Sequence, residues 1–532
     1  MGVRPCSSRA PRASRPTGSP SRATASRWTA PRSSATRVAA FLPTHREVIL
    51  PEPVDLSAFI KAYDVRGVVP SELNEPVARA IGAAFADVVV LPEVAAGERP
   101  QVVIANDMRP SGPSLVAAFA DGLAVRGVDV ITIGLASTDG LYFASGALGI
   151  PGAMFTASHN PAQYNGIKLC RAGARPVGQA SGLAAVRDLA GVYLADEVPV
   201  ADTVGEISSR DMLAEYAAFL RSLVDLSGIR PLKVVVDAGN GMGGFTAPAV
   251  LGTGAGLPAL PLEVIPLYFE LDGTFPNHEA NPLDPENLRD LQAAVVEHDA
   301  DLGLAFDGDA DRCFVIDQHG DPVSPSAITA LVGLREVARE RAAGRTPTVI
   351  YNLITSKVVP DLLAAAGATT VRTRVGHSFI KAEMAENDAV FGGEHSAHYY
   401  FRDFFFADTG MLAALHVLAA LGEQPHPLSV LAELYQPYSA SGEINSVVSS
   451  VDEARARVVE AYVTQQGAGP VSVDELDGLT VSHWDGHPQW WFNLRASNTE
   501  PLLRLNVEAA DEDIMEKVRD DVLALVRQES GA

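Results

Sequence analysis

The chain has few cysteines and no long apolar run. Three of its 532 residues are cysteine, namely Cys6, Cys170 and Cys313. This odd number at scattered positions argues against a disulfide framework, and a reducing cytoplasm is the expected location. No uninterrupted apolar run approaches the roughly 18 residues that a membrane-spanning helix needs, so we expect no transmembrane helix.

Positive charge is also scarce over most of the chain. Lys and Arg number 41 against 65 Asp and Glu, which gives a net charge of −24. Residues 1–46 hold nine Arg and no acidic residue, so removing these nine positive charges from −24 leaves −33 for residues 47–532. This acidic body would repel nucleic acid and anionic membranes, and neither is an expected partner. An anionic substrate would therefore need a local basic pocket.

Residues 1–46 are rich in Arg, Ser, Ala and Pro. Such a composition cannot build a core and predicts a disordered extension. It resembles an organellar transit peptide superficially, but it lacks the apolar segment of a secretory signal. An upstream translation start that adds a non-native tail is the alternative that we favour.

The rest of the chain has the composition of a soluble globular enzyme, and its length favours three or four domains. From about residue 50, short β-branched runs alternate with longer helical patterns, which indicates an α/β protein with mostly parallel sheets. The predicted strands are 102–105, 128–133, 234–236, 302–306, 348–351 and 389–391, and a helix is predicted over 114–125.

Joints rich in Pro or Gly divide this body into four blocks. The predicted domains are 50–204, 205–320, 321–430 and 431–532. The first three are candidates for repeats of one α/β design, although their sequences show no clear self-similarity. The last block is predicted to be α+β, with strands at 471–473, 489–494 and 502–507 and a following helix whose apolar face carries Ile514, Val518, Val522 and Leu525.

The most informative motif is Asp307-Gly308-Asp309-Ala310-Asp311-Arg312. Three carboxylates so close together would repel one another unless a hard cation such as Mg²⁺ or Ca²⁺ binds them. The adjacent Arg312 suits a nearby phosphate. An EF-hand is disfavoured because its sixth position should be Gly and its twelfth Glu, where this chain has Arg312 and Gln318. A solvated acidic turn and a phosphatase with an aspartate nucleophile remain alternatives.

A second motif places Ser158 and His159 shortly before Lys168. Ser158 could carry a phosphate whose oxygen completes the coordination of the metal, while His159 or Lys168 moves a proton or stabilises charge. A plain turn is the alternative interpretation.

Two further loops suit a sugar phosphate. Glu394 and Ser396, after two glycines, could bind sugar hydroxyls. The run 495–501, with Arg495 followed by Ser497, Asn498 and Thr499, could cradle a dianionic phosphate. Taken alone, the second loop could equally be a hydrogen-bonded turn.

Together these four motifs resemble the α-D-phosphohexomutase superfamily, which has a phosphoserine loop, a metal loop, a sugar loop and a phosphate loop in this order. The runs 62–67 and 374–378 support the resemblance, which covers about residue 55 to the C-terminus. The sugar loop is similar to the phosphomannomutase/phosphoglucomutase branch, from whose Gly-Glu-Met-Ser-Gly-His it departs at His395 and Ala397 but keeps His398. Ser137-Thr138-Asp139 stands where many members have Thr-Pro.

The resemblance implies four domains around a cleft: three related α/β domains with mixed sheets and a C-terminal α+β domain like the TATA-box-binding protein. It implies that Ser158 is phosphorylated and binds one Mg²⁺ together with Asp307, Asp309 and Asp311. Arg312 would contact the transferring phosphoryl group. The acid–base and charge-stabilising candidates are Arg66, His159, Lys168 and His377; the substrate-binding candidates are Tyr63, Lys357, Glu394, Ser396, Arg495, Ser497, Asn498 and Thr499.

The implied activity interconverts mannose 6-phosphate and mannose 1-phosphate through a hexose 1,6-bisphosphate, which also serves as activator. Glucose phosphates are expected substrates too, because a loop that binds the 3- and 4-hydroxyls does not test C2. The alternatives are phosphoglucomutase as the main activity, a metal-dependent sugar-phosphate phosphatase with Asp307 as nucleophile, and a non-catalytic sugar-phosphate-binding protein. A monomer or homodimer is expected.

Overall fold

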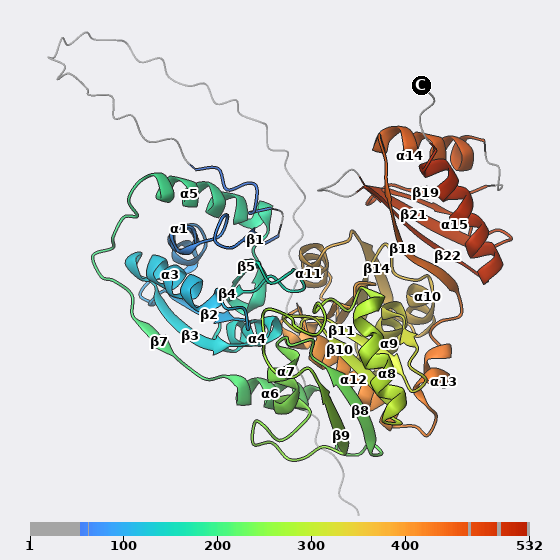
Figure 1. The fold of residues 1–532 in the computed structure, drawn as a ribbon, viewed down its shortest axis with the longest axis horizontal. Coiled ribbons are helices and arrows are strands. Elements are labelled where there is room, and N and C mark those ends of the chain that lie inside the picture. The colour runs from blue at the N-terminus through green and yellow to red at the C-terminus, as the bar shows by residue number, and fades with distance from the viewer. Residues whose placement is uncertain (1–53, 62, 466–469, 497–501, 529–532) are drawn as a thin grey trace, which may run out of the picture. The chain divides into compact units, whose positions relative to one another are not determined.

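The computed structural model describes residues 54–61, 63–465, 470–496 and 502–528. The Arg-rich extension predicted at 1–46 lies outside these residues. Over the described ranges, no helix is both long and apolar enough to cross a membrane. Four sheets follow one another along this part of the chain, and each takes its strands from one continuous stretch of sequence (Figure 1).

The first sheet has the order β1-β5-β4-β2-β3-β7, and β6 pairs with β5. Its strands are β1 (Val65–Val68), β2 (Gln101–Asn106), β3 (Asp129–Leu135), β4 (Gly152–Phe155), β5 (Tyr164–Arg171), β6 (Arg175–Pro176) and β7 (Ile207–Ser209). Its helices are α1 (Glu75–Phe85), η1 (Ala86–Val90), α2 (Leu91–Glu93), α3 (Gly112–Val125), α4 (Thr138–Leu148), η2 (Ala172–Ala174), η3 (Gln179–Ser181) and α5 (Leu183–Ala195). The sheet thus includes a strand beyond the predicted limit at 204.

The second sheet has the order β12-β11-β10-β8-β9. Its strands are β8 (Leu232–Asp237), β9 (Leu262–Leu267), β10 (Leu302–Phe306), β11 (Cys313–Asp317) and β12 (Pro322–Val323). Its helices are α6 (Leu213–Leu223), α7 (Gly243–Val250), η4 (Pro285–Leu288) and α8 (Arg289–Glu297). Every residue of β10 is buried, as expected for an uninterrupted apolar run in the middle of a sheet.

The third sheet has the order β14-β13-β15-β16-β17. Its strands are β13 (Thr348–Asn352), β14 (Thr369–Thr373), β15 (Phe391–Gly393), β16 (Tyr399–Phe401) and β17 (Ala407–Asp408). Its helices are α9 (Pro325–Ala342), α10 (Val358–Ala365), α11 (His377–Glu386), η5 (Arg402–Phe404), α12 (Gly410–Gly422) and α13 (Leu428–Glu433).

The strand predicted at 389–391 was misplaced, because β15 runs from Phe391 to Gly393. Two glycines look like a turn in the sequence, but here helices pack directly on them. A Cβ on Gly393 would lie 2.4 Å from Cγ2 of Thr329, and one on Gly392 would lie 2.9 Å from Sδ of Met384. The strand therefore needs glycine for close approach rather than for a turn.

These three sheets share one design. In each, three parallel strands are followed by two antiparallel ones: β3-β2-β4 then β5-β1, β9-β8-β10 then β11-β12, and β14-β13-β15 then β16-β17. The structure thus reveals a repeat that sequence comparison of the blocks does not. The predicted class, three related α/β domains with mixed sheets followed by an α+β domain, is confirmed.

The fourth sheet is antiparallel, with the order β18-β22-β21-β20-β19. Its strands are β18 (Ser439–Val447), β19 (Ser472–Asp474), β20 (Leu479–Ser482), β21 (Trp490–Ala496) and β22 (Leu502–Ala509), and its helices are α14 (Val451–Val459), η6 (Glu460–Thr464) and α15 (Glu512–Val526). Helix α15 buries Met515, Val518, Val522 and Val526. The predicted face was therefore one residue off at its ends, where Ile514 and Leu525 are only half-buried.

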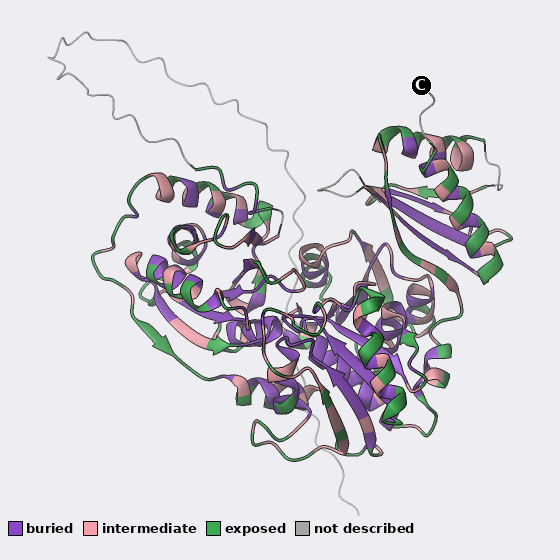
Figure 2. Ribbon diagram, in the orientation of Figure 1, coloured by how far each residue is buried: buried purple, intermediate pink, exposed green. Residues whose placement is uncertain are grey.

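The cores explain which parts of the chain hold the site together. The central strands of the four sheets are largely buried, whereas edge strands such as β7 and β18 are mostly exposed or half-buried (Figure 2). One apolar cluster extends from Val103 to Ala432 and so joins the first three sheets, whereas the fourth sheet has its own cluster with Trp490 and Phe492. Loops carried by the first three sheets are thereby fixed relative to one another by shared packing.

Candidate active site

The three loops that the sequence singled out occupy the same place in the three related domains. Residues 156–163 join β4 to β5, 307–312 join β10 to β11, and 394–398 join β15 to β16. Each loop therefore follows the last parallel strand and precedes the first antiparallel one. The fourth motif also connects two antiparallel strands, β21 and β22.

Ser158 is held in an uncommon backbone conformation. Its φ is +48°, a region that L-residues adopt rarely and that is enriched at functional sites. Its N–H donates to Oγ1 of Thr156 at 2.9 Å, and its side chain is buried. Its Oγ donates to Oδ2 of Asp307 at 2.8 Å and lies 3.1 Å from Nδ1 of His159. The hydroxyl thus sits between an imidazole and the first carboxylate of the metal loop.

Arg109, which the sequence analysis did not select, holds this loop from behind. The guanidinium is 1% exposed and donates to the carbonyl oxygens of Ser158 at 2.9 Å and Asn160 at 2.7 Å. It also donates to those of Pro161 and Tyr164, both at 2.9 Å, and to Oδ2 of Asp107 at 3.2 Å. A charged pair directly after the buried strand β2 was the available sequence signal.

The metal loop brings its three carboxylates together. Oxygens of Asp307, Asp309 and Asp311 lie within 4.8 Å of one another, and each residue is at most 1% exposed. The loop packs backbone to backbone on the serine loop, since a Cβ on Gly308 would lie 2.4 Å from the carbonyl oxygen of Ser158. Only glycine permits this approach.

Lys168 provides the positive charge nearest to these acids. Its Nζ donates to Oδ2 of Asp309 and to Oδ2 of Asp311, both at 2.7 Å. Burial acts to lower the pKa of Lys168, but the charges of Asp309 and Asp311 outweigh it and hold that pKa well above its usual value. Burial, followed by the charge of Asp309, raises the pKa of Asp311 to about 7.

The cluster fits a divalent cation. Oδ1 of Asp309 and Oδ1 of Asp311 are buried and have no hydrogen-bond partner among the described residues. Such orphaned acceptors are costly unless a cation or a donor satisfies them. All the available ligand atoms are carboxylate oxygens, the donor set that hard cations such as Mg²⁺ prefer.

Two arginines, Arg312 and Arg66, lie near His159. Nε of Arg312 donates to Oδ2 of Asp307 at 2.9 Å, and Nη1 of Arg66 donates to Oδ1 of Asn160 at 2.7 Å. Nη2 of Arg312 and Nε of Arg66 are buried without a partner in the described part of the chain. Burial, then the charges of Arg312 and Arg66, lowers the pKa of His159 well below its usual value. These arginines place positive charge beside His159, which is what the binding of an anionic substrate requires.

Glu394 is the residue of the sugar loop whose side chain is held by several hydrogen bonds. It is 2% exposed and accepts from Nδ2 of Asn352 at 3.0 Å, from the hydroxyl of Tyr400 at 2.7 Å and from the N–H of Gly376 at 3.3 Å. The last bond links the loop to 374–378, the run that supported the resemblance. Ser396 is half-buried in the same loop.

Tyr63 and His377 come together from two sheets. Their ring centroids are 5.3 Å apart, and His377 opens helix α11 directly after Gly376. Burial lowers the pKa of His377 to about 3, and the charge of Lys381 adds to that effect. The imidazole is therefore neutral at physiological pH.

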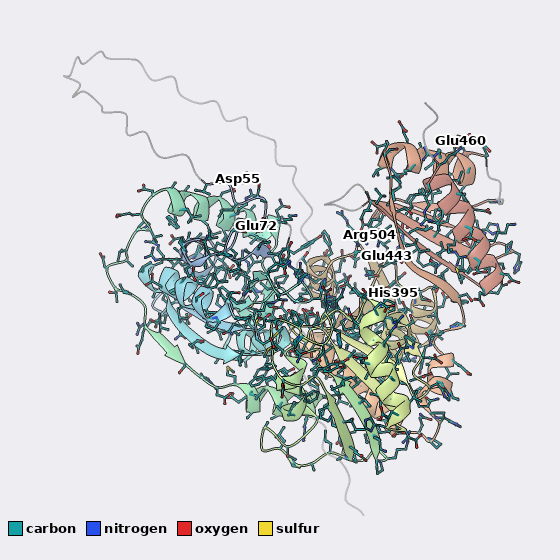
Figure 3. All side chains as sticks on the ribbon, in the orientation of Figure 1. Asp55, Glu72, His395, Glu443, Glu460 and Arg504 are labelled. Carbon is teal, nitrogen blue, oxygen red and sulfur yellow. The ribbon has the colours of Figure 1, made fainter. Side chains whose placement is uncertain are left out.

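The remaining predicted residues are Lys357, before helix α10, and the run from Arg495 at the end of β21. Lys357 pairs with Asp361 one turn on in helix α10. Nη2 of Arg495, at the end of β21, lies 3.5 Å from Oε2 of Glu443, whose Oε1 also pairs with Nη1 of Arg504 at 3.1 Å (Figure 3). Ser497, Asn498 and Thr499 lie outside the described residues.

The chain matches four family models in order. They are phosphoglucomutase/phosphomannomutase alpha/beta/alpha domain I at residues 58–188, domain II at 214–320, domain III at 324–438 and the C-terminal domain at 443–525. The chain belongs to the phosphoglucomutase/phosphomannomutase family. The enzyme class predicted from the four motifs, an intramolecular phosphotransferase of the phosphohexomutase type, is confirmed by this membership.

Similar proteins cover nearly the whole chain. A phosphomannomutase of Salmonella montevideo is 41% identical over 476 residues, which are 88% of this chain and 98% of that protein. Phosphohexose mutases of Xanthomonas campestris pv. campestris are 39% identical over 477 residues, 89% of this chain and 99% of theirs. A crystal structure of a phosphoglucomutase/phosphomannomutase family protein from Burkholderia thailandensis is 30% identical, with a TM-score of 0.75 over 89% of this chain and 98% of that one.

Proposed function

We propose that this family member is a phosphomannomutase, which interconverts mannose 6-phosphate and mannose 1-phosphate and also acts on glucose phosphates. The observation that carries the proposal is the 2.8 Å contact between Oγ of Ser158 and Oδ2 of Asp307, beside two further carboxylates and two arginines with unpaired donors. A nucleophile, a cation site and anion-binding groups are the parts that phosphoryl transfer needs. The similarity to enzymes named phosphomannomutase favours mannose as the substrate.

Each half-reaction moves one phosphoryl group between Ser158 and a sugar hydroxyl. In the first, the bond between phosphorus and Oγ of phosphorylated Ser158 breaks and a bond to the free sugar hydroxyl oxygen forms, which gives a hexose 1,6-bisphosphate. The hydroxyl loses its proton and Oγ gains one, so the charge balances. His159, 3.1 Å from Oγ, is neutral because its pKa is lowered, so the protonated Lys168 is our candidate to supply the proton that Oγ gains. His377 is our candidate to accept the proton from the sugar.

The charged groups around Ser158 have different proposed roles. Asp307, Asp309, Asp311 and the phosphoserine would hold one Mg²⁺, which when bound supplies positive charge against the phosphoryl oxygens. Arg312 and Arg66 each offer a buried unpaired N–H to those oxygens. Lys168, which pairs with both Asp309 and Asp311, would stabilise the negative charge of these carboxylates.

The sugar must bind in two orientations, because either phosphate has to reach Ser158. Glu394 and Ser396 would hold the 3- and 4-hydroxyls in both. Arg495, Ser497, Asn498 and Thr499 would bind the phosphate that is not being transferred, with Tyr63 and Lys357 as further contacts. A hexose 1,6-bisphosphate would act as activator because it can phosphorylate Ser158. The preference for mannose over glucose, a cytoplasmic location and a monomeric or homodimeric state stay predictions.

One assay tests this function. Turnover on mannose, glucose and N-acetylglucosamine phosphates is measured with Mg²⁺ and a hexose 1,6-bisphosphate. The proteins compared are the unchanged chain, Ser158→Ala and the control Ser114→Ala, at an exposed position of helix α3. We expect mannose and glucose phosphates to be isomerised, and Ser158→Ala to lose at least about 10³-fold in kcat, as expected for a nucleophile. Full activity in Ser158→Ala would overturn the proposal. Release of free phosphate without isomerised sugar would instead identify a phosphatase.

A further inference from the structure

Asp139 is a fully buried carboxylate that contacts no substrate-binding residue named above. It lies in the first turn of helix α4 and is 0% exposed. Its Oδ1 accepts a short hydrogen bond from Oγ of Ser137, and its Oδ2 accepts from the hydroxyl of Tyr216 at 2.7 Å and from Oγ1 of Thr409 at 2.6 Å. These three hydroxyls come from the first domain, from helix α6 and from the N-cap of helix α12. One carboxylate thus ties together three stretches of chain that are distant in sequence.

The first of these stretches reaches the metal loop directly. Thr138, between Ser137 and Asp139, donates its N–H to the carbonyl oxygen of Asp309 at 2.9 Å. It also donates Oγ1 to Oδ2 of Asp309 at 2.5 Å. The middle carboxylate of the metal loop is therefore held through both its backbone and its side chain by the residue next to Asp139.

The stretch 408–410 reaches the other end of the metal loop. Asp408 accepts from Nδ1 of His398 at 3.1 Å, and this nitrogen also lies 3.7 Å from Oδ1 of Asp311. A Cβ on Gly410 would lie 2.6 Å from the carbonyl carbon of Arg312, so this backbone packs tightly on the end of the loop. Thr409, the partner of Asp139, stands between these two contacts.

We propose that Asp139 is a positioning residue for the metal loop. By binding Ser137 and Thr409 at once, it fixes 137–139 and 408–410 relative to each other, and these two stretches flank Asp309 and Asp311. The carboxylates then need no rearrangement when a cation binds. This inference rests on the metal site of the proposed function. It also gives a role to Ser137-Thr138-Asp139, the segment that departs from the Thr-Pro of many family members.

Tyr216 and Thr409 allow the idea to be tested without removing the buried charge. Tyr216→Phe and Thr409→Val each remove one donor to Asp139, Thr409→Ser keeps the hydroxyl, and Asp139→Asn changes the acceptor itself. The matched control is Tyr193→Phe, in the same domain. It also removes a tyrosine hydroxyl that donates to a carboxylate, here that of Asp87, but no hydrogen bond or ion pair in the described part of the chain links this pair to the metal loop. Mg²⁺ binding is measured by isothermal titration calorimetry on the full-length chain, and folding is checked by circular dichroism.

We expect Asp139→Asn to raise the dissociation constant for Mg²⁺ about 10- to 100-fold, the usual effect of losing an outer partner of metal ligands. Tyr216→Phe and Thr409→Val should raise it by smaller factors, and Thr409→Ser and Tyr193→Phe should leave it within about twofold. The KM for mannose 1-phosphate at saturating Mg²⁺ should change less than the dissociation constant for Mg²⁺, because the side chain of Glu394 bonds to Asn352, Gly376 and Tyr400 and not to Asp139 or its hydroxyl partners.

Two results would overturn the inference, and only the second would also overturn the metal site of the proposed function. If the unchanged chain binds Mg²⁺ and the folded variants at Tyr216 and Thr409 bind it equally well, Asp139 has only a structural role. This comparison decides the matter even if Asp139→Asn does not fold. If the unchanged chain itself binds no Mg²⁺, the metal site of the proposed function is wrong, and the positioning role falls with it.

Discussion

Oγ of Ser158 lies 2.8 Å from Oδ2 of Asp307, although 149 positions separate the two residues in sequence. The contact joins the turns that follow the last parallel strand of two different sheets. Behind it, Gly308 packs on the carbonyl oxygen of Ser158, so the two loops touch through backbone as well as side chain.

Gly308→Ala should separate these loops without changing any charge. The new Cβ would lie 2.4 Å from the carbonyl oxygen of Ser158, closer than atoms can approach, so one backbone must move. We expect a loss of about 1–3 kcal/mol in stability from overpacking and a fall in kcat of about 10²-fold from misplacing the reacting groups. Denaturant unfolding and steady-state kinetics measure both. Gly228→Ala, where a Cβ would meet nothing within 4 Å, is the control; an equal loss there would refute the explanation.

Arg109→Lys tests whether a guanidinium must hold the serine loop. Lysine keeps the charge beside Asp107 but cannot reach four carbonyl oxygens with a planar fork. The loss of two or more buried hydrogen bonds should cost about 2–3 kcal/mol, and kcat should fall about 10²-fold. Arg99, whose exposed side chain pairs with the buried Asp129, gives the control Arg99→Lys. If Arg109→Lys has the same unfolding free energy and kcat as Arg99→Lys, the guanidinium of Arg109 is not needed.

Chelation of divalent cations should remove the activity of the unchanged chain but leave it folded. The reason is that Lys168 places a positive charge 2.7 Å from both Asp309 and Asp311, which partly neutralises these acids without a metal. In Lys168→Gln this charge is missing, and we expect a loss of about 3–5 kcal/mol in chelator, the usual effect of stranding buried charges. Mg²⁺ should recover much of it by mass action. Thermal unfolding with chelator and with Mg²⁺ measures the difference; equal destabilisation under both conditions would contradict the prediction.

His416 should make the stability of the third domain depend on pH. Burial, then the charges of Arg335 and Arg339, lowers the pKa of His416 to about 3. The unfolded chain therefore takes up a proton below pH 6.5 that the folded chain rejects, so the contribution of His416 to stability falls by about 2 kcal/mol between pH 7 and pH 5.

The variant His416→Gln isolates this effect, because glutamine is neutral at every pH. Glu336, whose Oε1 lies 3.4 Å from Nε2 of His416, has a pKa that burial raises to about 7, so it adds stability as pH falls. Since Glu336 is present in both proteins, the difference in their pH dependence reports on His416. From pH 7 to pH 5 the stability of the variant should rise relative to that of the unchanged chain by about 2 kcal/mol in denaturant unfolding. Parallel pH profiles would show the prediction to be wrong.

The sequence selected residues that the structure brings together, but it did not select the residues that support them. Asp307, Asp309, Asp311 and Arg312 form a local pattern whose charges need explaining on their own. Arg109 and Asp139 have no such pattern, because their partners are carbonyl oxygens and hydroxyls far away in sequence. In the first three sheets, sequence patterns found β2, β3, β8, β10 and β13 but none of the strands that pair only antiparallel. They also misplaced β15, since packing against Thr329 rather than local propensity keeps Gly393 in a strand.

Each sheet draws its strands from one uninterrupted stretch of chain, whereas the site takes residues from several sheets. During synthesis the first sheet can therefore be complete while later ones are still being made, because domains generally fold as units from the N-terminus. Ser158 would then lie in a folded turn that cannot react until the chain through residue 312 has left the ribosome. A ribosome-bound or truncated chain that ends before the metal loop should be well structured and yet unable to transfer phosphate.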